Sequence, residues 1–432
     1  MFSSLNEIYS AFLQHPVIVT DSRNLVPSCM FFALKGERFN GNVFASEALE
    51  KGAAWVVIDE PGYKVNSRCL LVENVLAALQ DLANHHRRQF SIPVIAITGT
   101  NGKTTTKELI SSVLSEKFNI ISTRGNLNNH IGVPLTLLRI GSDTQLAVVE
   151  MGANHQGEID FLCRIAMPGY GLITNIGKAH LEGFGGFEGV VKTKTELYRF
   201  LASVKGRVFV NAGDHLLMKY SEGMESITYG TEDSAWLSGK PESSEDLVSV
   251  KLRHENSGEL VVHSKLFGEY NALNIMAAAC IGKYFEVEDD KIKSALESYQ
   301  PANNRSQVKT TEKNLLLLDA YNANPSSMEA ALRSFASSSY DKKMVILGDM
   351  LELGDESDKL HESVLKLLVD LSFSDVYLVG PVFTRVNTKR EFLCFDDSEL
   401  ARLWFGHHQP SGKSILLKGS RGIKLENVSE IL

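Results

Sequence analysis

A glycine-rich stretch from Val94 to Lys107 carries the residues best suited to hold a phosphate group. It opens with an apolar run that predicts a buried strand, is broken by Gly99 and Gly102, and continues in a helical pattern. Unpaired backbone N–H groups at the start of such a helix, together with the helix dipole, attract an anion. Lys103 adds a positive charge that can reach terminal phosphates, and the Thr104 hydroxyl suits Mg²⁺.

The spacing of this loop differs from the general phosphate-loop pattern. That pattern, G-x-x-x-x-G-K-[ST], requires glycine where this chain has Ile97, and the first glycine here is Gly99, so the loop is tighter. The alternative is an ordinary glycine-rich turn before a helix. A Gly-Lys-Thr sequence that follows a strand and opens a helix is the context that favours nucleotide binding over that alternative.

Two further apolar runs end in residues that could bind a metal ion. The predicted strand Leu146–Val149 leads directly into Glu150, and a carboxylate at the carboxyl end of a buried strand lies at the usual ligand edge of an α/β sheet. Such a position often holds Mg²⁺. His180 follows a predicted strand at Gly171–Ile176, where contact with a metal or phosphate and a purely structural role are equally compatible with the sequence.

Amide side chains gather in two places. The loop Arg124–Pro134 is dense in asparagine, whose amides can donate to ligand oxygens but also simply make turns. Asn271 and Asn274 lie three residues apart at the start of a predicted helix, so both can face one ligand, or one of them can cap the helix. Lys194, in a helical stretch at 190–201, is by its pattern alone an ordinary lysine on a helix face.

The remaining pattern predicts the elements that must position these residues. Residues 1 to about 88 form a small α/β unit, with strands at Val17–Thr20, Cys29–Leu34 and Trp55–Ile58 and helices at Phe44–Gly52 and Leu76–Arg88. Residues 207–264 have little helical signal; they predict strands at Leu247–Leu252 and Leu260–Ser264 and a polar loop over 230–246.

The C-terminal part of the chain alternates strands with helices. Strands are predicted at Leu315–Leu318, Met344–Leu347, Asp375–Val379 and Ile415–Lys418. This alternation predicts a doubly wound parallel sheet. Polar residues after its strands place the ligand edge of that sheet at Asp319, Asp349 and Lys418.

Composition narrows the class of protein. A chain of 432 residues exceeds the size of a single core, so two or three domains are expected. The net charge of -8 argues against a nucleic-acid or membrane-surface binder. The five cysteines form no CxxC pair, and the chain shows neither a signal-peptide pattern nor an apolar run long enough for a membrane helix. We therefore expect a cytoplasmic protein without membrane insertion. Separately, we expect a monomer.

Several motifs taken together resemble the Mur ligases of bacterial cell-wall synthesis. The resemblance runs from Asp21 to about Gly422. The phosphate-loop motif is shared by the whole family. The motifs that begin at Gly125, Glu150, Asp319 and Gly348 are more specific to its dipeptide-adding branch. The motifs are Thr98–Thr104, Gly125–Pro134, Glu150–Glu158, Ala179–Gly185, Asp319–Pro325, Gly348–Gly354 and Lys418–Arg421.

The resemblance implies an α/β protein of three domains. Residues 1–88 would be a small N-terminal α/β domain that holds the UDP end of the substrate. Residues 89–303 would be a central P-loop-type ATPase domain with a mainly parallel sheet, and residues 304–432 a C-terminal Rossmann-like domain. Related enzymes commonly have glycine before the arginine of the last linker, whereas this chain has Asn304 before Arg305.

The resemblance also assigns roles to single residues. The catalytic set would be Lys103, His180 and Lys194. ATP would be held by Gly99, Thr100, Asn101, Gly102, Lys103, Thr104, Thr105, Asn271, Asn274, Arg305 and Asp319. One Mg²⁺ would be bound by Thr104 and Glu150, and a second by His180 and by Lys194 in carbamylated form. Ser22 and Arg23 would contact uridine, Asn126, Asn128 and Asn129 the muramoyl-peptide, and Tyr321, Asn322 and Asn324 the incoming dipeptide.

The implied activity is ATP-dependent amide ligation in peptidoglycan precursor synthesis. The partners would be UDP-N-acetylmuramoyl-tripeptide and D-alanyl-D-alanine, joined through an acyl phosphate with release of ADP and phosphate. One alternative is a sibling ligase that adds an amino acid to a muramoyl-peptide or glutamate to a folate. Another is a nucleotide-binding protein without catalysis. The motifs at Gly125–Pro134 and Asp319–Pro325 argue against the siblings, and the presence of Lys103, Glu150, His180 and Lys194 argues against lost catalysis.

Overall fold

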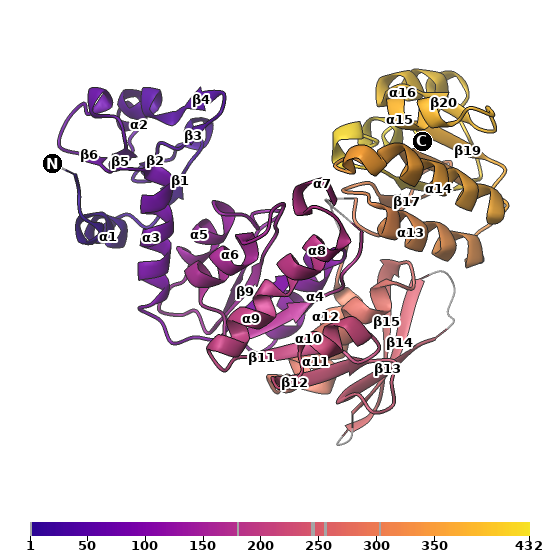
Figure 1. Cartoon of the computed structure of the whole chain (residues 1–432), viewed down its shortest axis with the longest axis horizontal. Coiled ribbons are helices and arrows are strands. Elements are labelled where there is room, and N and C mark those ends of the chain that lie inside the picture. The colour runs from indigo at the N-terminus through magenta and orange to yellow at the C-terminus, as the bar shows by residue number, and fades with distance from the viewer. Residues whose placement is uncertain (1, 179–180, 243–246, 255–256, 302–303) are drawn as a thin grey trace.

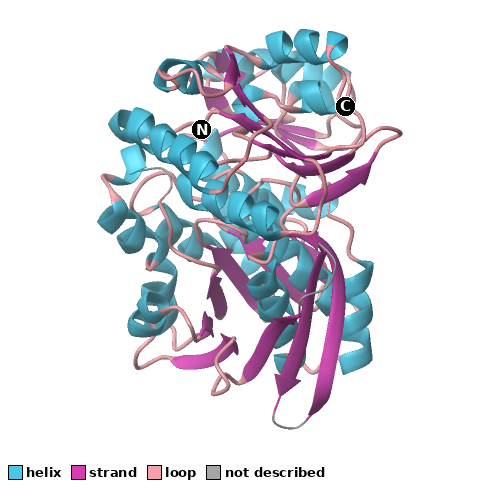
Figure 2. Ribbon diagram, turned by 90° about the vertical axis from the view of Figure 1, so that its right-hand side faces the viewer, coloured by secondary structure: helices cyan, strands magenta, loops and turns pink. Residues whose placement is uncertain are grey.

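The computed structural model describes residues 2–178, 181–242, 247–254, 257–301 and 304–432. The chain forms three lobes, each with its own sheet, and Figure 1 shows the N-terminal and C-terminal lobes standing on the same side of the central one. Figure 2 shows helices packed against the strands of these sheets. None of the helices in the described part of the chain combines the length and hydropathy that a membrane crossing requires.

The N-terminal lobe has a four-stranded parallel sheet. Its strands lie in the order β1 (Ile18–Val19), β2 (Met30–Phe32), β5 (Trp55–Ile58) and β6 (Cys69–Leu71), and β3 (Lys35–Gly36) pairs with β4 (Phe39–Asn40) in a small hairpin. Its helices are α1 (Leu5–Gln14), α2 (Ala45–Glu50) and α3 (Val75–Arg87), so the predicted elements of this region are present. Helix α3 also fastens this lobe to the next, because Asn84 donates to the carbonyls of Arg164 and Ile165.

The central sheet is mainly parallel. Its order is β15 (Ser257–Phe267), β14 (Leu247–His254), β13 (Leu237–Glu242), β12 (Glu225–Gly230), β11 (Arg207–Asn211), β10 (Tyr170–Ile173), β7 (Val94–Thr98), β9 (Leu146–Glu150) and β8 (Ile120–Ser122). Only the pairings of β13 with β14 and of β14 with β15 are antiparallel among the described strands. Alternation along β7 sends Val94 and Ala96 to one core and Ile95 and Ile97 to the other.

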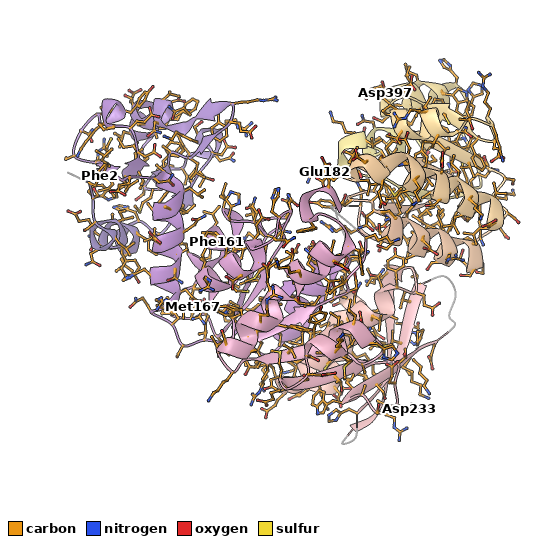
Figure 3. The ribbon with its side chains drawn as sticks, in the orientation of Figure 1. Phe2, Phe161, Met167, Glu182, Asp233 and Asp397 are labelled. Atoms are coloured by element: carbon orange, nitrogen blue, oxygen red, sulfur yellow. The ribbon has the colours of Figure 1, made fainter. Side chains whose placement is uncertain are left out.

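Helices cover both faces of this sheet. One core packs against α4 (Lys103–Ser115), α11 (Asn271–Tyr284) and α12 (Asp289–Ser298). The other packs against α3, α5 (Gly132–Leu137), α6 (Glu158–Ala166), α8 (Phe187–Lys194), α9 (Glu196–Ser203) and α10 (His215–Tyr220). The short α7 (Leu181–Phe184) reaches the C-terminal lobe, where a Cβ built on Gly354 would lie 3.1 Å from Glu182 Cβ; Figure 3 shows Glu182 where the two lobes meet.

Two predictions for the central lobe were wrong in detail. The helical stretch at 190–201 is two helices, because the backbone at Thr195 has ψ near -3° and its hydroxyl donates back to the carbonyl of Val191, a bond that bends helices. The polar stretch 230–246, predicted as a loop, contains β13. That strand forms because β12 and β14 pair with it on both sides and Leu237 is buried, which a search for apolar alternation does not detect.

The C-terminal lobe has the predicted doubly wound sheet. The strand order is β16 (Gln307–Thr310), β17 (Leu315–Asp319), β21 (Ser414–Lys418), β18 (Lys343–Gly348), β19 (Val376–Val379) and β20 (Leu393–Phe395), with β16 antiparallel and the others parallel. One face packs against α13 (Pro325–Ser337), α14 (Ser357–Asp370) and α15 (Pro381–Val386). The other packs against α16 (Ser398–His407) and α17 (Glu426–Ser429).

The ligand edge predicted for this sheet is only partly correct. Asp319 and Lys418 end neighbouring strands in register with each other and line the cleft described below. Asp349 is fully buried, and its two carboxylate oxygens accept the N–H groups of Val382 and Phe383 at the start of α15. This carboxylate therefore anchors a helix of its own lobe and does not line the cleft.

Candidate active site

A cleft of about 1360 Å³ lies between the central and C-terminal lobes and extends to α3 of the N-terminal lobe. It exceeds the roughly 300–1,000 Å³ typical of a pocket for one small ligand, so it has room for a nucleotide together with a second substrate. The predicted residues that line it are Thr100, Asn101, Gly102, Lys103, Thr104, Thr105, Asn126, Asn128, Asn129, Glu150, Lys194, Asn271, Asn274, Arg305, Asp319, Tyr321, Asn322 and Asn324.

The phosphate loop has the geometry expected from its glycines. Strand β7 ends at Thr98, α4 begins at Lys103, and between them Gly99 and Gly102 adopt positive φ angles of 140° and 78°. A Cβ on Gly99 would lie 2.0 Å from the Thr174 hydroxyl oxygen, and one on Gly102 would lie 2.8 Å from an amide oxygen of Asn274. Both positions therefore need glycine for conformation and for space.

Lys103 lies over this loop. Its ammonium donates to the carbonyl oxygens of Gly99 and Thr100, both at 2.9 Å. Loss of solvent around the ammonium lowers its pKa, against the opposing effect of the Glu150 carboxylate. A cation held by two neutral carbonyls at the start of a helix is available to a phosphate, since charge-assisted bonds to an anion are the stronger ones.

Glu150, at the end of β9, offers one carboxylate oxygen to a cation. The residue is only 1 % exposed. Its Oε1 accepts the Thr104 hydroxyl at 3.1 Å and the Asn128 amide at 2.7 Å, while Oε2 has no hydrogen-bond partner among the described residues. A buried carboxylate oxygen without a partner is unfavourable, and a hard cation would relieve it, so Thr104 and Glu150 fit Mg²⁺.

Lys194 ends α8 inside the same cleft. It is 3 % exposed, and its ammonium lies 5.4 Å from the ring centre of Phe184. Burial, followed by the charge of Lys103, lowers the pKa of Lys194 to about 7. This lowered pKa favours the uncharged, nucleophilic amine at lower pH than for an exposed lysine. His180, predicted to act beside it, lies outside the described residues.

The two asparagines at the start of α11 are tied to their surroundings. Asn271 donates to the carbonyl of Phe267 and to the Ser306 hydroxyl, and it accepts the amide of Asn274 at 2.8 Å. Asn274 in turn accepts the Thr106 hydroxyl of α4. Neither side chain caps α11, since the cap position is Tyr270, so the capping alternative does not hold.

The C-terminal lobe supplies charged and aromatic groups to the cleft. Asp319 forms an ion pair with Lys418 at 2.5 Å. The Arg305 guanidinium stacks 3.5 Å from the ring centre of Tyr321. Asn304, which precedes Arg305, has a φ of 54°, in the left-handed region that glycine favours and that asparagine tolerates better than most other residues.

Among the predicted residues that the structure describes, three do not line the cleft. Gly99 is the first residue of the phosphate loop but is not part of the cleft lining, and Ser22 and Arg23 lie in the short helix η1 (Ser22–Asn24) of the N-terminal lobe. Arg23 is largely exposed and forms a 2.6 Å ion pair with Asp21, whose pKa is lowered to about 2 by the hydrogen bonds from Arg23. The structure therefore keeps Ser22 and Arg23 apart from the phosphate loop.

Sequence reasoning missed Asn175 and Ser326. The Asn175 side chain accepts the backbone N–H of Asn101 at 3.0 Å, and Ser326 accepts the Asn101 amide at 3.2 Å. Asn175 follows β10, so the rule that singled out Glu150 would have found it. No local signal identifies Ser326, because its partner lies 225 positions away in the chain.

Comparison with known proteins gives one consistent result. The models of the Mur ligase catalytic domain, the Mur ligase middle domain and the Mur ligase glutamate ligase domain match residues 16–87, 97–282 and 304–421. The chain is 34% identical over 424 residues to the UDP-N-acetylmuramoyl-tripeptide--D-alanyl-D-alanine ligase of Bacillus subtilis, covering 95% of this chain and 92% of that protein. The ligase of the same name from Escherichia coli is 32% identical over 440 residues, with 99% and 95% covered.

Solved structures agree with these sequence matches. MurF from Acinetobacter baumannii superposes with a TM-score of 0.87 at 31% identity, covering 99% of this chain and 98% of that one. MurF ligase from Thermotoga maritima, in complex with ADP, superposes with a TM-score of 0.85 at 28% identity, with 97% of each chain covered. Similarity of this extent in both sequence and fold shows that the chain belongs to the Mur ligase family.

Proposed function

We propose that this chain joins D-alanyl-D-alanine to the terminal carboxylate of UDP-N-acetylmuramoyl-tripeptide in peptidoglycan precursor synthesis. ATP drives the reaction and is released as ADP and phosphate. The observation that carries the proposal is the full-length similarity to ligases of that name, together with a cleft in which a phosphate loop faces the Asp319–Pro325 segment. We also propose that the chain acts as a cytoplasmic monomer, with domain boundaries near residues 88 and 303.

The reaction needs an activated carboxylate. The substrate carboxylate attacks the γ-phosphate of ATP in line, which yields ADP and an acyl phosphate. The amine of D-alanyl-D-alanine then attacks the acyl carbon, and phosphate leaves as the amide forms. Such a reaction depends mainly on positioning and charge neutralisation, which the cation of Lys103 and the start of α4 are placed to supply.

Two metal sites are part of the proposal. Thr104 and Glu150 would hold one Mg²⁺, which neutralises charge on the phosphates. His180 and a carbamylated Lys194 would hold the second. The lowered pKa of Lys194 supports the carbamate, because an uncharged amine can add to carbon dioxide and lose a proton to give an anionic, carboxylate-like group.

The remaining predicted residues keep their roles as proposals. Asn271, Asn274, Arg305 and Asp319 would contact the nucleotide, since all four line the cleft near the phosphate loop. Ser22 and Arg23 would hold uridine, and Asn126, Asn128 and Asn129 the muramoyl-peptide. Tyr321 and Asn322 would face the dipeptide. Asn324 lines the same part of the cleft, but its amide is bonded to the phosphate loop.

The test is phosphate release measured with ATP, Mg²⁺, UDP-N-acetylmuramoyl-tripeptide and D-alanyl-D-alanine, omitting each in turn. We expect release only in the complete mixture, with the pentapeptide product detected by mass. Release with a different amine acceptor would move the chain to a sibling ligase. Release from neither the complete mixture nor an acceptor panel would overturn the catalytic proposal in favour of a nucleotide-binding protein. Light scattering at the mass of one chain tests the monomer.

A further inference from the structure

Three side chains from two lobes form a closed ring of hydrogen bonds at the edge of the phosphate loop. The Asn101 amide donates to the Ser326 hydroxyl at 3.2 Å, and that hydroxyl donates to Asn324 Oδ1 at 2.9 Å. The Asn324 amide closes the ring by donating to Asn101 Oδ1 at 2.7 Å. Each side chain therefore donates once and accepts once within the ring.

The direction of these bonds is fixed from outside the ring. The backbone N–H of Ser327 donates to Asn324 Oδ1 at 2.9 Å as part of the cap of α13. A backbone N–H can only donate, so the Asn324 atom that faces it must be oxygen and the atom that faces Asn101 must be nitrogen. Asn101 must then present its own oxygen to Asn324 and its nitrogen to Ser326.

The backbone of Asn101 is bonded to other residues of the central lobe. Its backbone N–H donates to Asn175 Oδ1, and its carbonyl accepts the Thr174 hydroxyl at 2.6 Å and the Asn175 amide at 3.0 Å. The backbone of Asn101 is thus fixed by the loop after β10, and its side chain by the start of α13. In Figure 1, α13 lies on the side of the C-terminal lobe that faces the central lobe.

We propose that Asn324 and Ser326 are positioning residues for the phosphate loop. Through Asn101 they hold the C-terminal lobe against that loop, so that the nucleotide site reaches its working shape only when α13 and the adjoining Asp319–Pro325 segment are in place. This inference rests on the proposed function. It assigns Asn324 to the phosphate loop instead of to the dipeptide, because both polar atoms of its amide are engaged in the ring and the cap.

The variant Asn324→Asp removes one bond from the ring at constant shape. Its carboxylate still accepts from Ser327 and keeps α13 capped, because aspartate caps helices as well as asparagine does. It can no longer donate to Asn101, and two oxygens then face each other. We expect the dissociation constant for ADP, measured by calorimetry without other substrates, to rise about tenfold, with the same rise in KM for ATP and a smaller change in KM for D-alanyl-D-alanine.

The matched control is Asn74→Asp, which makes the same chemical change at the exposed cap of α3, outside the lining of the cleft. Asn74→Asp should leave the dissociation constant for ADP unchanged. A rise confined to KM for the dipeptide in Asn324→Asp, with normal ADP binding, would overturn the inference and return Asn324 to the dipeptide site. Because ADP binding needs no ligation, a wild-type protein without activity would refute the proposed function and still allow the ring to be tested.

A double-mutant cycle between Asn101→Ala and Ser326→Ala gives an independent test. Substitutions within one hydrogen-bond network do not have additive effects on binding. The dissociation constant of the double variant for ADP should therefore be at most about twofold higher than that of the weaker-binding single variant. Ser326→Ala shortens a partly buried side chain and leaves the Asn324 cap intact, so it should fold. Fully additive losses would show that the two residues act separately and would contradict the ring.

Discussion

Glu150 and Asp349 lie at the carboxyl ends of strands in two different sheets, but their carboxylates are bonded differently. Glu150 is the last residue of β9 and Asp349 directly follows β18, and each residue is at most 1 % exposed. Both oxygens of Asp349 accept backbone N–H groups of α15, whereas Glu150 Oε2 has no partner among the described residues. Position at the end of a strand therefore does not mark a ligand site by itself. The groups that fold against the carboxylate decide whether any bonding capacity is left for a ligand.

The largest effect on activity should come from removing the Lys103 ammonium from the phosphate loop of the central lobe. We expect Lys103→Ala to lower the rate of phosphate release by about a thousandfold or more, because Lys103 is the one positively charged side chain in the phosphate loop, Gly99–Thr104. The control is Lys413→Ala, which breaks an ion pair with Asp375 beside the start of β21, outside the lining of the cleft, and should keep near-normal turnover. Near-normal ligation by a folded Lys103→Ala protein would refute this site.

Glu150→Gln tests the free oxygen directly. We expect turnover to fall by about a hundredfold and the Mg²⁺ concentration for half-maximal rate to rise, because a neutral amide is a weaker ligand for a hard cation. The unfolding midpoint should stay level or rise, since a buried charge with an unpaired oxygen is removed. A clear loss of stability with normal Mg²⁺ dependence would make Glu150 a structural carboxylate like Asp349.

Asp349→Asn should show the reverse pattern. One backbone N–H of α15 would then face an amide NH₂ group, and the free energy of unfolding should fall by about 1–3 kcal/mol in denaturant titrations. The KM values for ATP and for both substrates should change little at temperatures where the variant is folded. A raised KM for ATP at unchanged stability would contradict the structural role of Asp349 and with it the difference between Asp349 and Glu150.

The pH dependence of stability should distinguish Lys194 from an ordinary surface lysine. Its folded pKa of about 7 lies below that of an unfolded lysine, so above pH 7 the unfolded chain binds more protons at this site. The stability of the wild type relative to Lys194→Met should therefore rise between pH 7 and 9, by at most about 1.4 kcal/mol per pH unit. Parallel curves for the two proteins would show that this lysine is not desolvated.

Local patterns in the sequence determined much of the fold. Apolar runs predicted β7, β9 and the four main strands of the C-terminal sheet, because each has a largely buried, mostly apolar centre and polar residues stand mainly at the strand ends. The phosphate loop was equally predictable. Its glycines, its lysine and the helix that follows act within about ten residues of one another, and backbone geometry at that range depends on residue type.

Other features were decided by contacts between distant parts of the chain. Strand β13 forms because its neighbours β12 and β14 pair with it on both sides. Which strand-end carboxylate stays open depends on where α15 begins relative to Asp349. The bonds of Asn101 with Asn324 and Ser326 join residues more than 220 positions apart. The amino-acid sequence thus determined the chemistry available to this protein, and only the packing of distant segments, within each lobe and between lobes, decided which polar groups were left to meet a ligand.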